Sequence, residues 1–384
     1  MTGSESTLKS VTITNPYTWP WVRRGSERLL NDLAQYLVGE GLDVEIYAMG
    51  PQDQDRRERG IVTHLIRQRL KLPFRQLNDC HYFAWTLQKR LARCWSDVVH
   101  CLNYFDGYAA VQARRRYGLN FRIVFHAVGI PTARYFRAVP IDRMMMKTVL
   151  AEADAVLGLS QFACDCIEGD FGVKPKLLPP PVVVGELQPD SRFEDPTILF
   201  VGDVTEPRKG AETLILAMPK IRERIPNARL LLSGHVTEDV INRLMNKEAV
   251  RELEPHIQFL GVGNIGDLPA LYRAASVCVL PSVWEAFGLV LVESLANGTP
   301  VVGSRHAGVT DIIEGNETVG RLFDPGSFDR MTTNVDGLAD AVVDVLTAGD
   351  AMRGKVCHAR AQHFSWDHLG PRYTELYQQL LEAS

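Results

Sequence analysis

Two glutamates, Glu285 and Glu293, stand at the ends of the run EAFGLVLVE, in which every residue between them is apolar or glycine. An ionised carboxylate in an apolar environment is costly unless it is hydrogen-bonded or takes up a proton. These two side chains therefore need partners. Carboxylate oxygens accept hydrogen bonds, so the hydroxyl groups of a ligand are suitable partners.

The same run predicts a binding site for an anion. A buried strand is expected just before it, and a helix is expected to begin near Gly288. The backbone N–H groups of Phe287, Gly288 and Leu289 would then be free at the positive end of the helix dipole, where phosphate binds readily. Ligands of doubly wound sheets bind at such strand-to-helix junctions. We therefore expect Glu285 and Glu293 to flank a phosphate site.

A second cluster with possible phosphate chemistry is GDVTEPRKGAETL (202–214), again between an expected strand and an expected helix. Arg208 and Lys209 come just before that helix and offer several donors to phosphate oxygens. An Arg–Lys–Gly run in a loop is also common as plain surface charge. The junction position, in the same half of the chain as the two glutamates, favours a phosphate clamp.

The first half of the chain offers two weaker candidates. Gly25 opens a helix after the loop NPYTWPWVRRGSERLL (15–30), which lacks the G-x-G-x-x-G fingerprint of dinucleotide-binding proteins. A plain helix N-terminus is the alternative there. His126 ends the expected strand RIVFH, and a structural histidine is the alternative at that position.

Strand and helix patterns alternate along the chain, which is typical of parallel sheets covered by helices on both faces. SVTIT (10–14) predicts a strand, and GSERLLNDLAQYLVGEG (25–41) predicts the helix that follows it. The alternation stops at LLPPPVVVGELQPDSRFEDP (177–196), where three consecutive prolines and a polar stretch predict a linker, and it restarts with TILFVGDV (197–204). The fold class is therefore α/β, with two Rossmann-like domains of similar size and a cleft between them.

The composition narrows the class of protein. The chain has 384 residues, of which 46% are hydrophobic and 23% charged, and no run of eighteen apolar residues occurs. The N-terminal residues lack the basic-then-apolar order of a signal peptide. Seven cysteines without CxxC spacing indicate reduced thiols, with neither a zinc site nor a disulfide framework. We expect a cytoplasmic protein that binds no metal.

The charge is uneven along the chain, whose net charge is −4: the first half is basic and the second half acidic. The segment RRERGIVTHLIRQRLKLPFR (56–75) mixes arginines with apolar residues as a peripheral membrane helix does. It predicts contact with an anionic membrane, at the inner face, with a solvated surface as the alternative. No aromatic interleaving supports binding to nucleic acid.

Taken together, these motifs resemble the retaining glycosyltransferases of family four, which have the GT-B fold. The resemblance covers most of the chain and is strongest over 197–325. The spacing of Glu285 and Glu293, followed by ANGTPVVGSRHAGVTDIIEGNETVGRLFDPG, resembles the E-x7-E signature of the family. The EPRKG run is similar to the phosphate loop of phosphatidylinositol mannosyltransferases.

The resemblance implies how the domains divide. Residues 1–182 would form an acceptor-binding domain and 183–365 a nucleotide-sugar-binding domain, with a C-terminal helix over 366–384 crossing back to the first. In the second domain, Arg208 and Lys209 would neutralise the leaving diphosphate.

It also implies roles for the remaining candidates. Glu285 would contact the hydroxyls of the donor sugar and Glu293 the ribose. Phe287, Gly288 and Leu289 would bind diphosphate or sugar through backbone N–H groups. Gly234 and Gly263 would shape the nucleotide pocket. Gly25 would let its loop close over donor and acceptor, and His126 would form a hydrogen bond to the transferred sugar.

Two positions depart from the family pattern. Where the family has Gly-Arg after the first strand of the second domain, Gly202 is followed by Asp203, whose charge would repel a diphosphate. Either Arg208 replaces that arginine or Asp203 turns away. The paired glycines after the first strand are reduced to Arg24–Gly25.

The resemblance predicts a hexosyltransferase-type enzyme: retaining transfer of a sugar from a nucleoside diphosphate sugar to an acceptor hydroxyl, without metal or cofactor. UDP is the commonest nucleotide in the family, and the acceptor is a small molecule, a glycan or a lipid-linked compound. One alternative is a catalytically silent nucleotide-binding or partner subunit, motivated by Asp203. A nucleotide-sugar epimerase or a phosphorylase on the same fold is another. The missing glycine fingerprint disfavours a nicotinamide dehydrogenase.

Overall fold

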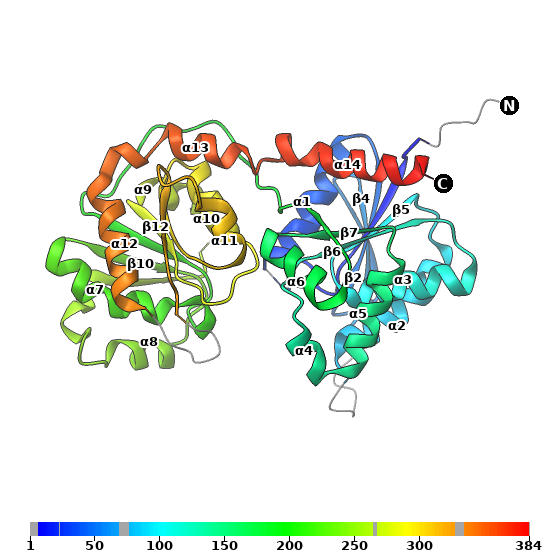
Figure 1. Cartoon of the computed structure of the whole chain (residues 1–384), viewed down its shortest axis with the longest axis horizontal. Coiled ribbons are helices and arrows are strands. Elements are labelled where there is room, and N and C mark those ends of the chain that lie inside the picture. The colour runs from blue at the N-terminus through cyan, green and yellow to red at the C-terminus, as the bar shows by residue number, and fades with distance from the viewer. Residues whose placement is uncertain (1–6, 23, 69–76, 264–266, 327–333, 384) are drawn as a thin grey trace. The chain divides into compact units, whose positions relative to one another are not determined.

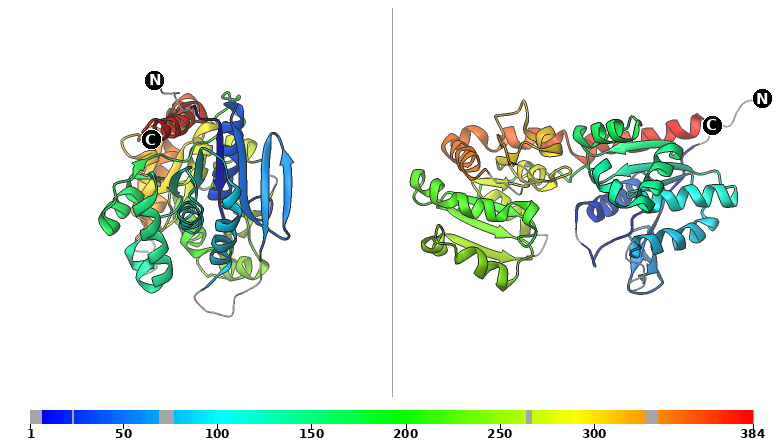
Figure 2. Two further views of the ribbon diagram at one scale, coloured as in Figure 1. Left: turned by 90° about the vertical axis from the view of Figure 1, so that its right-hand side faces the viewer. Right: turned by 60° about the horizontal axis from the view of Figure 1, so that its bottom comes forward.

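The computed structural model describes residues 7–22, 24–68, 77–263, 267–326 and 334–383, and it divides the chain into two compact units. Unit 1 comprises Met1–Pro181 together with Trp366–Ser384, and unit 2 comprises Val182–Ser365. The boundary between the two units, at residues 181 and 182, lies within the proline-rich stretch 177–196. Each unit is an α/β sandwich in which helices cover both faces of one sheet (Figures 1 and 2).

Unit 1 contains an eight-stranded sheet in the order β3-β4-β2-β1-β5-β6-β7-β8. All described pairings are parallel except β3 with β4. The strands are β1 (Ser10–Thr14), β2 (Asp43–Gly50), β3 (Gln54–Glu58), β4 (Ile61–Arg67), β5 (Val98–Cys101), β6 (Arg122–Ala127), β7 (Ala155–Gly158) and β8 (Lys176–Leu177). The helices are α1 (Gly25–Gly39), α2 (Asp79–Arg90), α3 (Tyr104–Tyr117), α4 (Ala133–Ala138), α5 (Pro140–Glu152), α6 (Gln161–Phe171) and α14 (Trp366–Glu382).

The expectation of a membrane helix within 56–75 is wrong for the described part of that segment. Residues 54–67 form the antiparallel β3–β4 hairpin, and residues 69–75 lie outside the described residues. The hairpin turns at Arg59 and Gly60, whose φ angles are +50° and +83°. Two-residue hairpin turns require such positive values, and an Asn-Gly or Asp-Gly pair is their usual signal. Because arginine stands at the first position, the sequence lacks the usual signal of this turn.

The helix α14 belongs to unit 1 although it follows unit 2 in the sequence. Its side chains Tyr373 and Tyr377 are fully buried, and the Tyr377 hydroxyl lies 2.7 Å from Nδ1 of His100 on β5. A Cβ atom at Gly370 would lie 2.5 Å from the ring of Tyr36, so glycine permits the close approach of α14 to α1. Figure 1 shows α14 lying along this unit.

Unit 2 contains a six-stranded parallel sheet in the order β11-β10-β9-β12-β13-β14. The strands are β9 (Thr197–Val201), β10 (Arg229–Ser233), β11 (Ile257–Gly261), β12 (Val277–Leu280), β13 (Val301–Ser304) and β14 (Gly320–Phe323). The helices are α7 (Ala211–Arg224), α8 (Glu238–Met245), α9 (Leu268–Ala274), α10 (Leu289–Ala296), α11 (Ala307–Ile313), α12 (Val335–Ala348) and α13 (Lys355–Gln362). β9 and β12 are central, and their apolar side chains are buried because helices cover both faces.

Within the described residues, no helix combines the length and the apolar character that crossing a membrane requires.

Candidate functional site

The strand order of unit 2 fixes where a ligand is expected. The chain goes from β9 to β10 on one side and later returns to β12 on the other side of β9, so the order reverses between β9 and β12. Crevices beside the carboxyl ends of strands at such a reversal are the usual ligand sites of doubly wound sheets. Arg208 and Lys209 follow β9, and Glu285 follows β12. The structure therefore brings these three residues to one edge of the sheet.

The loop after β9 is tied directly to the loop after β12. The backbone N–H of Val283 donates to the carbonyl of Arg208 at 2.9 Å, and Nη1 of Arg208 donates to the carbonyl of Trp284 at 2.9 Å. Between Lys209 and α7, Gly210 has a φ of +77°, and a Cβ there would lie 2.2 Å from the carbonyl oxygen of Pro281. Only glycine lets the two loops approach this closely.

An ion pair between Lys209 and Glu285 is the central contact of this edge. Nζ of Lys209 lies 2.5 Å from Oε2 of Glu285, and the two side chains are 20% and 14% exposed. Because both are largely buried, removing either charge would leave the other poorly solvated. Arg208 lies beside the pair and is held by Oε1 of Glu206 at 2.6 Å. The edge thus combines two cations, Arg208 and Lys209, with the carboxylates of Glu206 and Glu285, whose oxygens can accept hydrogen bonds from hydroxyls.

The start of α10 provides the expected backbone donors. Gly288 precedes the helix with a φ of +100°, and Phe287 and Gly288 are buried while Leu289 is half-buried. Among the residues that the structure describes, no side chain caps the start of this helix. The first N–H groups of a helix have no partner within it, and they carry the positive end of its dipole. They can bind an anion near Glu285.

Glu293 lies in the second turn of α10, as predicted, and its partner is Tyr272. The Tyr272 hydroxyl donates to Oε2 of Glu293 at 2.9 Å, and Tyr272 is 1% exposed. Sequence reasoning missed Tyr272 because its apolar surroundings indicate only a core residue. A buried tyrosine hydroxyl usually has a hydrogen-bond partner, and that was the available signal.

Asp203 turns into its own loop. Its Oδ1 accepts hydrogen bonds from the backbone N–H of Thr205 at 2.9 Å and from the Thr205 hydroxyl at 2.5 Å. These bonds stabilise the turn after β9. Of the two possibilities raised by the sequence, the structure shows the carboxylate engaged locally, with Arg208 on the same loop.

The two glycines expected to shape the nucleotide pocket differ. Gly234 has a φ of +141°, and a Cβ there would lie 1.8 Å from the carbonyl oxygen of Gly202. It therefore allows the ends of β9 and β10 to lie in contact. Gly263 is exposed, and a Cβ there would meet nothing within 4 Å.

The two candidates of unit 1 do not join a cluster with one another. Gly25 is exposed at the first residue of α1, where the Glu27 carboxylate accepts the backbone N–H of Arg24 at 3.0 Å. His126 is fully buried, and its Nε2 donates to the carbonyl of Leu178 at 3.1 Å. Burial lowers the pKa of His126 to about 4, so the ring is neutral near pH 7. Its role toward a sugar stays a prediction.

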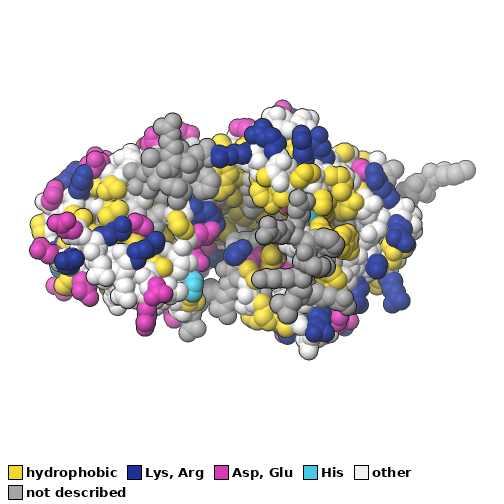
Figure 3. All heavy atoms as spheres, turned by 90° about the horizontal axis from the view of Figure 1, so that it is seen from below, with side chains coloured by type: hydrophobic (Ala, Val, Ile, Leu, Met, Phe, Trp, Pro, Cys, Tyr) yellow, Lys and Arg dark blue, Asp and Glu magenta, His cyan; other side chains and the backbone are white. Residues whose placement is uncertain are grey.

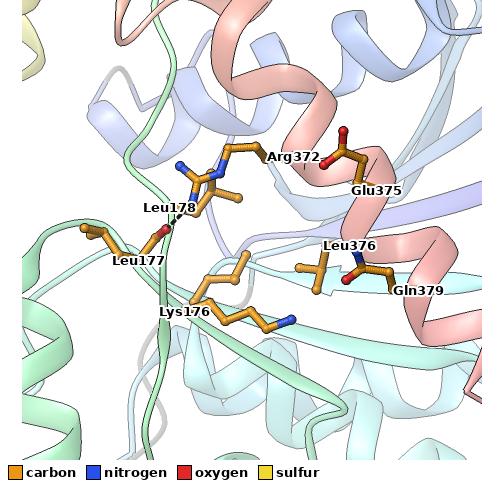
Figure 4. A pocket seen from close by; sticks show the side chains of 8 residues that line it. Lys176, Leu177, Leu178, Arg372, Glu375, Leu376 and Gln379 are labelled. Atoms are coloured by element: carbon orange, nitrogen blue, oxygen red, sulfur yellow. Dashed lines mark hydrogen bonds between the residues drawn. The ribbon is translucent and has the colours of Figure 1, made fainter.

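Unit 1 also contains a shallow pocket. It is bounded by β8 and α14, and Arg372 in its wall donates to the carbonyl of Leu177 at 2.8 Å (Figure 4). Its lining residues are Leu157, Lys176, Leu177, Leu178, Arg372, Glu375, Leu376 and Gln379. Among the described residues, no group of three or more His, Cys, Asp or Glu side chains is arranged to hold a metal ion.

The chain folds into two doubly wound α/β units. In unit 2, a basic pair and the start of a helix lie where the strand order reverses. These features define a protein of the GT-B class. Residues 23–184 match the family described as Glycosyltransferase Family 4, and residues 195–348 match Glycosyl transferases group 1. The chain belongs to this glycosyltransferase family.

Individual relatives agree with this assignment. The D-inositol 3-phosphate glycosyltransferase of Actinosynnema mirum is 30% identical over 304 residues, which cover 71% of this chain and 69% of the relative. The phosphatidyl-myo-inositol mannosyltransferase of Mycolicibacterium smegmatis is 30% identical over 188 residues, or 48% of this chain. That alignment spans less than half of the relative, 45% of its length.

The fold is also similar to that of a solved structure, the sucrose-phosphate synthase from Thermosynechococcus elongatus. The TM-score is 0.81 at 24% identity, covering 98% of this chain and 100% of the other.

Proposed function

We propose that this glycosyltransferase moves a hexose from a nucleoside diphosphate sugar to an acceptor hydroxyl with retention of anomeric configuration. The observation that carries the proposal is the Lys209–Glu285 ion pair at the edge where the strand order of unit 2 reverses. A cation and a hydroxyl acceptor side by side suit a ligand in which phosphate and sugar are adjacent.

Each part of this edge has a role in the proposed reaction. The bond between the anomeric carbon and the diphosphate oxygen breaks, and negative charge accumulates on the diphosphate. Lys209, Arg208 and the N–H groups at the start of α10 are positioned to stabilise that charge. Glu285 accepts hydrogen bonds from the sugar, and Glu293, held by Tyr272, accepts those of the ribose.

The acceptor completes the reaction. Its hydroxyl oxygen bonds to the anomeric carbon on the face that the diphosphate leaves, and its proton passes to a diphosphate oxygen. In this proposal no protein nucleophile is required. The positive groups named above take the place that a metal ion has in other sugar transfers, so the proposed reaction needs neither metal nor cofactor.

Donor and acceptor are proposed to bind different units. Unit 2 binds the donor, with UDP as the first nucleotide to test, and unit 1 binds the acceptor. The names of the two relatives given above contain inositol phosphate or phosphatidylinositol. We therefore propose an anionic or lipid-linked acceptor.

The test is calorimetry of the purified chain with UDP-, GDP-, ADP- and TDP-sugars, in buffer containing EDTA. One donor should bind in the micromolar range, and Glu293→Ala should abolish that binding. Glu223→Ala, which removes an exposed glutamate of α7, should leave it unchanged. A folded protein that binds none of these donors would refute the proposal and favour a silent subunit.

A further inference from the structure

A third loop reaches the edge of unit 2 at which Lys209 and Glu285 form their ion pair. β13 lies parallel to β12, so the loops that follow these two strands lie at the same edge of the sheet. The Ser304 hydroxyl donates to the carbonyl of Ser282 at 2.5 Å, and both serines are fully buried. The loop after β13 is therefore held against the loop that contains Glu285.

The start of α11 packs closely on the residues that precede α10. A Cβ atom at Gly308 would lie 2.5 Å from Cα of Phe287 and 2.7 Å from the carbonyl oxygen of Ala286, so glycine permits this contact. Ala307 is 5% exposed and has a φ of +46°. Alanine rarely adopts such a conformation, which persists where the surrounding packing imposes it and is common at binding sites. The packing thus fixes the loop that carries His306.

This loop places the ring of His306 beside the residues of the candidate site. The ring centroids of His306 and Trp284 are 5.0 Å apart, with an interplanar angle of 37°. Trp284 directly precedes Glu285, and its carbonyl accepts the hydrogen bond from Nη1 of Arg208. His306 is half-buried, and burial lowers the pKa of its ring below the ordinary value, although the charge of Glu285 opposes this shift. The ring is therefore neutral near pH 7.

A neutral imidazole beside a carboxylate suits a sugar hydroxyl. An ionised carboxylate only accepts hydrogen bonds, whereas a neutral imidazole also has an N–H to donate. A hydroxyl that donates its proton to Glu285 can therefore accept the N–H of His306 at its oxygen. Nucleoside diphosphate hexoses carry the same charge and differ in their hydroxyls, so hydrogen bonds at short range decide between them. Figure 3 shows acidic and basic side chains interspersed on unit 2, at the left of the view.

We propose that His306 determines, together with Glu285, which hexose the donor site accepts, by donating its N–H to a sugar hydroxyl that Glu285 also contacts. This role rests on the proposed function, in which Glu285 accepts hydrogen bonds from the sugar, and it adds a residue from a different loop. Packing against Trp284 holds the imidazole in place. A hexose that lacks this hydroxyl, or carries it in the opposite configuration, loses both hydrogen bonds.

The test is calorimetry of the full chain with the preferred nucleoside diphosphate hexose, its monodeoxy analogues and the nucleoside diphosphate alone. In the wild type, one analogue should bind at least about tenfold more weakly than the complete donor, because the hydrogen bonds of the missing hydroxyl are lost. His306→Phe keeps a ring against Trp284 but has no N–H, so it should bind the complete donor about fivefold to tenfold more weakly than the wild type. It should bind that same analogue within about twofold of the wild type, and the nucleoside diphosphate alone equally well.

A second histidine of unit 2 provides the matched control. His256 directly precedes β11 and so lies at the opposite, amino edge of the parallel sheet, and His256→Phe should bind every ligand as the wild type does. If His306→Phe weakened the nucleoside diphosphate alone as much as the complete donor, or lost affinity equally for every analogue, the proposed role of His306 would be wrong. A nucleoside diphosphate that binds the wild type as tightly as its hexose donor would refute this role alone. A folded wild type that binds no donor would refute the proposed function as well.

Discussion

The ion pair between Lys209 and Glu285 joins residues that are 76 positions apart in the sequence. In the proposed reaction Lys209 faces the leaving diphosphate, where charge grows as the bond breaks. Removing one preorganised donor of this kind costs about 100-fold or more in turnover. We therefore expect Lys209→Ala to lower the release of nucleoside diphosphate from the preferred donor by at least about 100-fold.

A second lysine of the same region provides the control. Lys220 on α7 is half exposed and pairs with the exposed Asp336, so Lys220→Ala should keep wild-type turnover. Equal activity of Lys209→Ala and Lys220→Ala would exclude Lys209 from the reaction.

The two glycines at the ends of β10 and β11 differ in a way that stability measurements can detect. Alanine at 234 would require an unfavourable positive φ and would clash with the carbonyl of Gly202. We expect Gly234→Ala to lower the free energy of unfolding by at least about 2 kcal/mol, measured by urea denaturation. A Cβ atom at Gly263 would meet nothing within 4 Å, so Gly263→Ala should change the free energy of unfolding by less than about 0.5 kcal/mol. Similar losses in both would mean that the contact of β9 with β10 is looser than described.

The strands and helices show which structural features the sequence could predict. The strand over 10–14 and the helix beginning near Gly288 were predictable because apolar patterns and glycine stop signals act locally. The β3–β4 hairpin was not, because its turn uses arginine where asparagine is the usual signal. The pairing of Glu293 with Tyr272 depends on how α9 packs against α10, and no short-range pattern encodes that contact.

The interface between α14 and the sheet of unit 1 contains two buried histidines. Burial lowers the pKa of His126 to about 4, and burial, with the charge of His126 next, holds the pKa of His100 well below its usual range. Each histidine is protonated more readily in the unfolded chain than in the folded one. Stability is therefore complete above about pH 6.5 and is lost as the pH falls toward 4.

The dependence of the unfolding free energy on pH can be measured for unit 1. The depressed pKa of His126 alone corresponds to about 3 kcal/mol of unfolding free energy lost between pH 6.5 and 4. We expect the double variant His100→Gln, His126→Gln to lose less stability over this range than the wild type in urea titrations. The exposed His368→Gln on α14 should behave as the wild type does. An unchanged acid slope in the double variant would contradict the burial of neutral rings.

At the scale of the whole chain, the structure predicts that the C-terminal helix α14 stabilises unit 1. Because α14 contributes Leu369, Tyr373, Leu376 and Tyr377 to the buried interior of unit 1, a chain ending at Ser365 exposes apolar surface there. We expect that truncation to lower the melting temperature of unit 1 by more than about 10 °C, followed by circular dichroism. A chain ending at Leu381 is the control and should melt as the wild type does. Identical melting of both truncations would show that α14 adds little to unit 1.

The stereochemistry of the released sugar tests the proposed reaction most directly. The preferred α-linked donor would be incubated with the protein alone, and the sugar released slowly to water would be followed by proton NMR before the anomers equilibrate. We expect the α anomer to form first, and Glu285→Gln to abolish release while the donor still binds. Release of the β anomer first would contradict retention.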